Sequence, residues 1–305
     1  MKTSPTTSET GVRAALLDVL HAQWREFGVP FNAILPGAKL EVIDPEELVW
    51  CSLEFTSQEP RLAEGVRAWV TANRTRINRQ RLNKLVRTSV NDQRSELWHA
   101  LENAAPSGAK AKKTKTKKTT TKKKKKKPLG NRADGPSTLL LRSRDTLGND
   151  CRSFLIAHLI GNPRGVRLRD VSKATGYSYR SISEAASSWE RAGVSRIKHG
   201  YCVLVNPAPW CELLGCTAAK VVVVDWHATY QASIELVRTL AKARALGFSP
   251  DHPLVISAIR TADAMLEIAA GGADRSRTPT HSRLRDALAV EWTSPDLVDT
   301  KNRRV

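Results

Sequence analysis

The stretch VRLRDVSKATGYSYRSISEAASSWERAG, residues Val166 to Gly193, decides the fold expected for the centre of this chain. Two short helices that cross steeply need a small residue where they approach each other and a glycine where the turn requires a positive φ. Ser172 supplies the small residue, Gly176 supplies the turn, and Ser178 suits the N-cap of the second helix. The pattern therefore predicts a helix-turn-helix.

The second helix of this pair has two faces of different chemistry. At 3.6 residues per turn the apolar face, which would pack on the protein, carries Ile182, Ala185, Ala186 and Trp189. The opposite face is polar and suits a major groove about 12 Å wide. On this face Arg180 could donate two hydrogen bonds to a guanine edge, and Glu184 could accept a hydrogen bond from a cytosine amino group. We expect the DNA-facing positions to be Ser178, Tyr179, Arg180, Ser183, Glu184 and Ser187.

A tight β-hairpin is predicted directly after this helix. Residues 194–198 and 201–205 both alternate in polarity, and the pair His199-Gly200 forms a two-residue turn between them. Arg196, Lys198 and His199 would lie at or near the tip, where they could contact phosphates.

The phrase ATGYSYRSISEAASSWERAGV resembles the turn and recognition helix of winged helix-turn-helix proteins, especially the MarR-type bacterial regulators. In that family the recognition helix enters the major groove and the wing touches the backbone or the minor groove, which implies the same roles for the residues named above. The resemblance covers Asp150 to Cys216. Arg167 departs from it, because a Ser or Thr cap commonly opens the first helix of the pair there. Winged helices also dock proteins, so protein docking stays open as an alternative.

The order of parts along the chain has a looser resemblance. In its order of parts the chain is similar to the antitoxin or regulator component of abortive-infection toxin–antitoxin systems. The parts are a helical N-terminal domain, a linker, a winged helix and a helical C-terminal arm. That resemblance implies a toxin as a protein partner.

Positive charge is concentrated in one tract. The chain has 49 Lys and Arg against 30 Asp and Glu, for a net charge of +19. The tract from Lys110 to Lys127 alone carries a charge of +12, which leaves +7 on the rest of the chain. Because the tract has almost no apolar side chains, we predict that residues 105–145 are a disordered linker. We expect its lysines to contact phosphates. The alternatives are an inert spacer and a tract that binds a membrane surface. The lysines of the tract are Lys110, Lys112, Lys113, Lys115, Lys117, Lys118, Lys122, Lys123, Lys124, Lys125, Lys126 and Lys127.

Apolar residues at helical spacing predict a helical domain at residues 10–104, after a disordered N-terminus at 1–9. Asp44 would cap a helix that begins at Pro45, and helix starts are also expected at Pro60 and after Asn78. Caps explain Asp44, Glu46 and Glu47 better than an acid–base or metal site does. Glu54 and Glu59 likewise have no histidine partner or Gly-rich loop. Arg79, Arg81 and Lys84 form either a second phosphate-contacting face or, as we prefer, an ordinary solvated helix face.

The C-terminal third is predicted to be a helical hairpin at residues 217–272, after the winged helix-turn-helix at 146–216. One amphipathic stripe runs through His227–Ala245, and a second follows Pro253. These helices could pair two copies into a homodimer or complete the core of one chain, and both alternatives stay open. A basic tail is expected at 273–305, with a short helix at Ser282–Val290.

Several classes of protein are excluded by what the sequence lacks. No apolar run approaches 18 residues, so we expect no membrane span, and the N-terminus has no apolar signal core. Five cysteines, an odd and sparse count, argue against a disulfide scaffold and for a reducing compartment. For a DNA-binding protein we expect a cytoplasmic, nucleoid-associated location. His199, Cys202, Cys211 and Cys216 could be assembled into a zinc site, but without a CxxC pair buried thiols are the better interpretation.

The sequence therefore predicts a mainly α protein without cofactor, metal or catalytic site, since it has no P-loop, HExxH or GxSxG motif. We expect a sequence-specific binder of double-stranded DNA, a transcriptional regulator. The alternative is a protein-docking module with non-specific nucleic-acid affinity.

Overall fold

The computed structural model describes residues 7–33, 35, 40–88, 135–249, 251–269 and 278–293. These residues form a mainly helical protein with two small sheets. The Lys-rich tract, residues 110–127, lies outside the described residues. Within the described part of the chain, no helix combines the length and the apolar character needed to cross a membrane.

The N-terminal helices are α1 (Thr7–Glu26), α2 (Pro45–Leu53), α3 (Pro60–Ala72) and α4 (Arg79–Thr88), with the 3-10 turn η2 (Arg74–Arg76) before α4. Three of them begin where the sequence predicts, whereas α1 begins at Thr7, inside the stretch 1–9 that was expected to be disordered. The Asp44 side chain accepts hydrogen bonds from the backbone N–H groups of Glu46 and Glu47, as an N-cap does. Asn78 Oδ1 accepts from Arg81 N at 3.0 Å in the same way. The expected caps are therefore confirmed.

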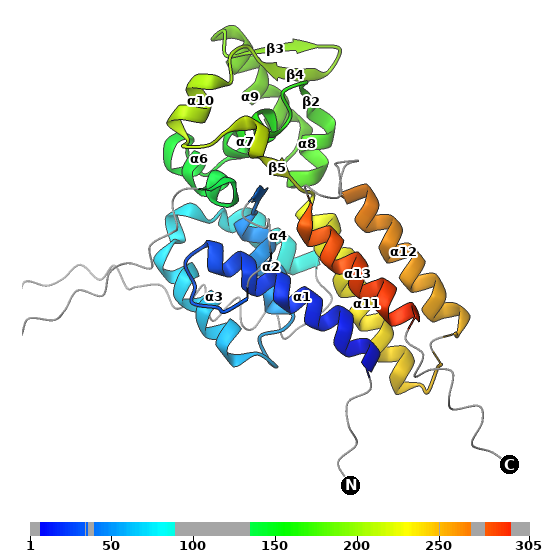
Figure 1. The fold of residues 1–305 in the computed structure, drawn as a ribbon. Coiled ribbons are helices and arrows are strands. Elements are labelled where there is room, and N and C mark those ends of the chain that lie inside the picture. The colour runs from blue at the N-terminus through cyan, green and yellow to red at the C-terminus, as the bar shows by residue number, and fades with distance from the viewer. Residues whose placement is uncertain are drawn as a thin grey trace, which may run out of the picture.

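The C-terminal helices pack on these N-terminal helices and share one hydrophobic core with them. They are α11 (Trp226–Ala245), α12 (Pro253–Ala269) and α13 (Pro279–Thr293). Strand β1 (Glu41–Val42) pairs in parallel with β5 (Val222–Val223), which joins the two parts of the chain a second time. We call this assembly of residues 7–88 and 222–293 the body (Figure 1).

Aromatic side chains fill the centre of the body. The Phe27 and Trp69 rings stack with centroids 5.0 Å apart, and Trp24 meets Trp69 edge-on at 5.3 Å. Trp24 Nε1 donates to Ser52 Oγ at 2.8 Å, so the buried indole N–H has a partner on α2. Each aromatic pair is worth about 0.5–1.5 kcal/mol beyond the area it buries.

Residues 135–221 fold around a second core and are inserted between the two parts of the body. We call them the inserted unit; they lie at the top of Figure 1. The helices are α6 (Leu139–Leu147), α7 (Cys151–Gly161), α8 (Leu168–Thr175), α9 (Tyr179–Arg191) and α10 (Ala208–Leu213). The strands β2 (Val166–Arg167), β3 (Ser195–Lys198) and β4 (Tyr201–Leu204) form an antiparallel sheet in the order β2-β4-β3. The 3-10 turns η3 (Pro136–Thr138) and η4 (Ala218–Lys220) lie near its two ends.

Three further expected boundaries differ from the structure. Residues 135–145, expected to belong to the disordered linker of 105–145, contain η3 and most of α6, because Leu139, Leu140 and Leu141 are buried. The tail expected at 273–305 contains α13, which packs on α1 and buries Leu284 and Leu288. The N-terminal domain of 10–104 and the hairpin of 217–272 are not separate, because their helices bury one common set of apolar side chains.

Candidate nucleic-acid interface

Helix α9 is fixed to the inserted unit by its apolar face. Ile182, Ala185, Ala186 and Trp189 are all buried in the second core. The helix begins at Ser178, whose Oγ accepts a hydrogen bond from Ser181 N at 3.1 Å. Gly176 forms the turn before it with φ of 70°, a left-handed conformation that favours glycine. Local sequence therefore determines both where α9 begins and which face it buries.

The polar face of α9 is open to solvent. The Arg180 side chain is 86% exposed and that of Glu184 is 65% exposed. Tyr179 is 51% exposed, and Ser178 is exposed as well. Ser183 and Ser187 are half-buried at the edge of the same face. Five of the six positions expected from the sequence thus lie along one strip of α9, and the sixth, Ser178, is the N-cap that precedes it.

Arg180 and Glu184 form an ion pair on this strip. Arg180 Nε donates to Glu184 Oε1 at 2.7 Å, one helical turn apart, and this contact raises the pKa of Arg180. An ion pair this exposed is screened by water and contributes little to stability. An incoming acceptor can therefore replace the carboxylate at little cost, so the pair does not lock the guanidinium away from a ligand.

The β3–β4 hairpin presents a cationic tip. Its turn residues His199 and Gly200 have φ of 51° and 78°, the two positive values that a type I′ turn requires. Arg196, Lys198 and His199 are all exposed. Glu190 Oε1 accepts from Ile197 N at 2.8 Å, which ties the hairpin to the end of α9. The hairpin therefore packs beside α9.

Sequence reasoning missed a cation on the edge strand of this sheet. Arg167 on β2 lies over the Tyr201 ring, 5.0 Å from its centroid, and its Nε donates to the Tyr201 hydroxyl. Both residues are exposed. The one available signal was that Arg167 stands where a capping residue is common, and its side chain indeed makes no cap hydrogen bond.

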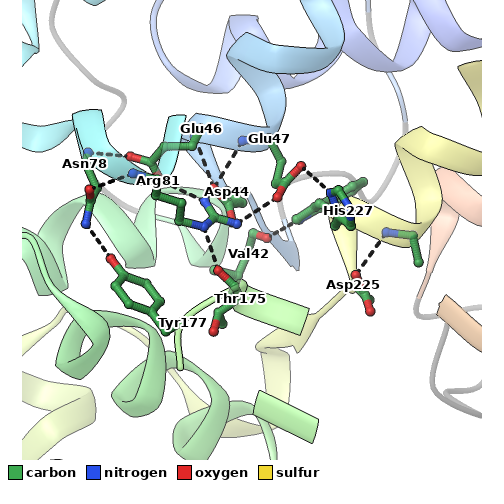
Figure 2. A network of polar contacts seen from close by, with 12 residues as sticks. Val42, Asp44, Glu46, Glu47, Asn78, Arg81, Thr175, Tyr177, Asp225 and His227 are labelled. Atoms are coloured by element: carbon green, nitrogen blue, oxygen red, sulfur yellow. Dashed lines mark hydrogen bonds and ion pairs between the residues drawn. The ribbon is translucent and has the colours of Figure 1, made fainter. Parts of the chain in front are cut away.

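The turn of the α8–α9 pair faces the body, where a buried ionic network holds it (Figure 2). At its centre is Arg81 of α4, whose Nη1 donates to Asp44 at 2.7 Å and to Glu46 at 2.9 Å. Its Nη2 donates to Glu47 at 2.8 Å, and its Nε donates to the Thr175 carbonyl at the end of α8 at 2.6 Å. Burial disfavours the Arg81 charge, but the three carboxylates outweigh it and raise the Arg81 pKa.

A second arginine joins α6 to the same carboxylates. Arg144 donates to both oxygens of Glu46, at 2.7 and 2.6 Å, and both side chains are buried. Arg81 and Arg144 also lie over the Phe154 ring, at 4.9 and 5.1 Å from its centroid. The buried Glu46 side chain is thus bound on both sides, by the body through Arg81 and by the inserted unit through Arg144.

One neutral contact and a histidine extend the network outward. Asn78 Nδ2 donates to the Tyr177 hydroxyl at 2.7 Å, and burial raises the pKa of Tyr177 to about 12. His227 Nδ1 lies 3.2 Å from Glu47 Oε2, and the hydrogen bond to Glu47 raises the His227 pKa. Burial raises the pKa of the neighbouring Asp225. The body therefore contacts the residues on either side of Gly176 and leaves the polar face of α9 uncovered.

The network corrects two expectations from the sequence. Arg81 is buried, so it belongs neither to a phosphate-contacting face nor to a solvated one, although Arg79 and Lys84 are exposed. Lys84 Nζ lies 3.5 Å from the Gly176 carbonyl. Asp44 is the expected cap, but the side chains of Glu46 and Glu47, which the sequence also assigned to capping, bind buried arginines.

The residues considered for zinc do not come together as a site. His199 is exposed at the hairpin tip, whereas Cys202 two residues after Gly200 is buried in the second core. Cys211 and Cys216 interact with each other, and burial raises the pKa of Cys216 to about 12. Across the described ranges, no group of three His, Cys, Asp or Glu side chains could hold a metal ion.

Comparisons of this chain with protein-family models, with curated proteins and with solved structures found no match.

Proposed function

We propose that the chain binds double-stranded DNA as a transcriptional regulator, with α8 and α9 as a winged helix-turn-helix and the β3–β4 hairpin as its wing. The observation that carries the proposal is the exposed polar face of α9, opposite the face that is buried in the protein. A recognition helix needs this combination, because its inner face must be rigidly packed while its outer face reaches base edges.

Each exposed group on this surface has a chemical role in the proposal. Arg180 forks to the O6 and N7 acceptors of a guanine, and the ion pair with Glu184 opens as it does so. Tyr179 and the serine hydroxyls contact bases or phosphates. Arg196, Lys198 and His199 at the hairpin tip contact the backbone, which fixes orientation but carries no sequence information.

The Lys-rich tract adds a contact of a different kind. Its twelve ammonium groups can neutralise phosphates and release condensed counterions, but they do not distinguish one base from another. The tract therefore raises affinity for any duplex, while α9 selects among duplexes.

The test begins by selecting preferred duplexes from a random library with the full chain. We expect Arg180→Ala to weaken the selected duplex about 5- to 150-fold, a loss of 1–3 kcal/mol, and to weaken a scrambled duplex much less. Arg67→Ala is the matched control, because Arg67 is an exposed arginine on α3 of the body. Equal losses on both duplexes for Arg180→Ala contradict the role assigned to α9.

The same experiment separates DNA binding from protein docking. A chain lacking residues 110–127 keeps α9 and the hairpin but loses the non-specific cations. If that chain selects no duplex even at low salt, the exposed surface of the inserted unit is a docking face for a protein partner instead.

A further inference from the structure

Helix α12 presents one face to the body and the opposite face to solvent. Val255, Ala262, Leu266 and Ala269 are buried, and the helix packs on α11 and α13. Asp263 on the flank facing α13 forms an ion pair with Arg285 at 2.5 Å. In Figure 1 α12 is the outermost helix of the body, far from the inserted unit's sheet.

The solvent face of α12 has an unusual composition for an exposed surface. Leu254 is 61% exposed. Ile268 is 77% exposed, which is the largest exposed fraction of any large apolar side chain among the described residues. Between them, at helical spacing, stand Ser257, Thr261 and Ala264, all exposed and all small. We call these five residues, from Leu254 to Ile268, the row; Ala258 and Met265 lie beside it and are half-buried. Large apolar residues at both ends and small ones in the middle let another helix approach closely.

We propose that this α12 face pairs with the same face of a second copy of the chain, with the two helices antiparallel about a two-fold axis at Thr261. The pattern is self-complementary in that register. Leu254 lies opposite Ile268 of the second copy, and Ala258 lies opposite Ala264, because each pair is symmetric about position 261. The small central residues then face one another where the helices approach most closely.

The charges beside the row fit the same register. Arg260 and Glu267 are exposed on one flank, and a two-fold axis places this flank against its own copy. The Cα atoms of Arg260 and the second copy's Glu267 are then about 7.5 Å apart along the helix axis at 1.5 Å per residue. Each side chain leans toward the N-terminus of its own helix, so in an antiparallel pair the two lean toward each other. A parallel pair would place like charges side by side.

The size of the face sets the expected affinity. Stable interfaces bury about 1,600 Å² in total, and one face of a 17-residue helix covers less than that. We therefore expect a reversible dimer that forms at micromolar concentrations. This pairing does not depend on DNA binding, since the residues involved lie on the body and not on α9.

Sedimentation velocity of the full chain between about 1 and 200 μM, a range that brackets micromolar affinity, tests the proposal without DNA. We expect dimers to accumulate over this range and Ile268→Glu to remove them. Leu213→Glu is the matched control, because Leu213 on α10 is also 61% exposed but lies on the inserted unit. Neither substitution touches a core, so both chains are expected to fold.

A charge exchange tests the register itself. We expect R260E to weaken the dimer about tenfold or more at low salt, since it sets carboxylates against each other, and we expect R260E/E267R to restore the dimer. Arg285 on α13 also interacts with Glu267, so thermal unfolding of each variant checks the fold. A chain that stays monomeric at 200 μM, a dimer that survives Ile268→Glu, or a double exchange that fails to restore pairing overturns the proposal. Each result leaves the DNA proposal untouched.

Discussion

Arg180 and Glu184 show how one contact can both hold and release a side chain. The carboxylate keeps the guanidinium on the exposed strip of α9, yet the pair is fully in water and costs little to open. Glu184 also places a negative charge on a surface that would approach phosphates. In the proposed complex it would therefore reduce non-specific attraction and leave selection to the hydrogen bonds that Arg180 can make.

This balance gives a prediction for Glu184→Gln. We expect the variant to bind a scrambled duplex several-fold more tightly at low salt, because it removes one negative charge from the surface that faces the phosphates. Fluorescence anisotropy with labelled duplex measures the change. Glu212→Gln on α10 is the control, since Glu212 is also exposed on the inserted unit. Weaker binding of Glu184→Gln would mean instead that the carboxylate itself accepts a hydrogen bond from the DNA.

Glu41 links pH to stability. It is buried on β1, where it accepts hydrogen bonds from the Thr280 backbone N–H at 3.1 Å and from the Thr280 hydroxyl. Burial raises its pKa to about 7, even though both hydrogen bonds act in the opposite direction. The folded chain therefore keeps a proton on Glu41 that the unfolded chain releases near pH 4.5. Because the folded state binds more protons in this window, the Glu41 contribution to stability falls as pH rises from about 4.5 to 7.

We expect Glu41→Gln to remove that pH dependence, because its amide oxygen can still accept from the Thr280 N–H and its amide nitrogen can donate to the Thr280 hydroxyl. Relative to the wild-type chain, the variant should gain on the order of 3 kcal/mol in unfolding free energy between pH 4.5 and pH 8. Urea unfolding of both chains at each pH measures the difference. The comparison must be made between variants, because His158 and His281, whose pKa burial lowers to about 4, shift stability in the opposite direction. A parallel pH dependence for the two chains would contradict the buried, protonated Glu41.

At the scale of elements, the buried network joins helices that are far apart along the chain. Glu46 and Arg144 are 98 positions apart, and Arg81 reaches the end of α8 across 94. Such a network contributes little net stability when intact, since desolvation opposes the attraction, but losing one partner leaves a buried charge unpaired. Its effect is to specify where α8 and α9 sit on the body.

Arg81→Ala is therefore expected to lower the unfolding free energy by about 3–5 kcal/mol. Urea unfolding measures the loss. Arg79→Ala, an exposed arginine in the same helix, should change stability by less than about 0.5 kcal/mol. A loss below 1 kcal/mol for Arg81→Ala would show that the network does not anchor the turn.

For the whole molecule, the distribution of charge predicts how DNA affinity depends on salt. Deleting residues 110–127 lowers the net charge from +19 to +7. We expect the deletion to weaken selected and scrambled duplexes by similar factors and to flatten the slope of log affinity against log salt. Titrations at several salt concentrations measure the slope. An unchanged slope would mean that the tract is a spacer without phosphate contacts.

The sequence predicts local features well because short-range chemistry determines them. The caps at Asp44 and Ser178, the turn at Gly176 and the His199-Gly200 hairpin each depend on a few adjacent residues. The network was missed because nothing near Glu46 indicates its partner Arg144. The same limit explains the domain boundaries, since the core shared by α1, α11 and α13 depends on contacts between the two ends of the chain.

The insertion of residues 135–221 into the body has a consequence during synthesis. Helix α4 ends at Thr88 and α11 begins at Trp226. At the usual rate of 5–20 residues per second, synthesis of the chain between them takes about 7–28 s. Through that interval the apolar side chains of α1 have no C-terminal helices to cover them. The nascent chain therefore exposes an aggregation-prone apolar surface while the inserted unit is being translated. A chaperone that shields α1 would raise the yield of folded protein.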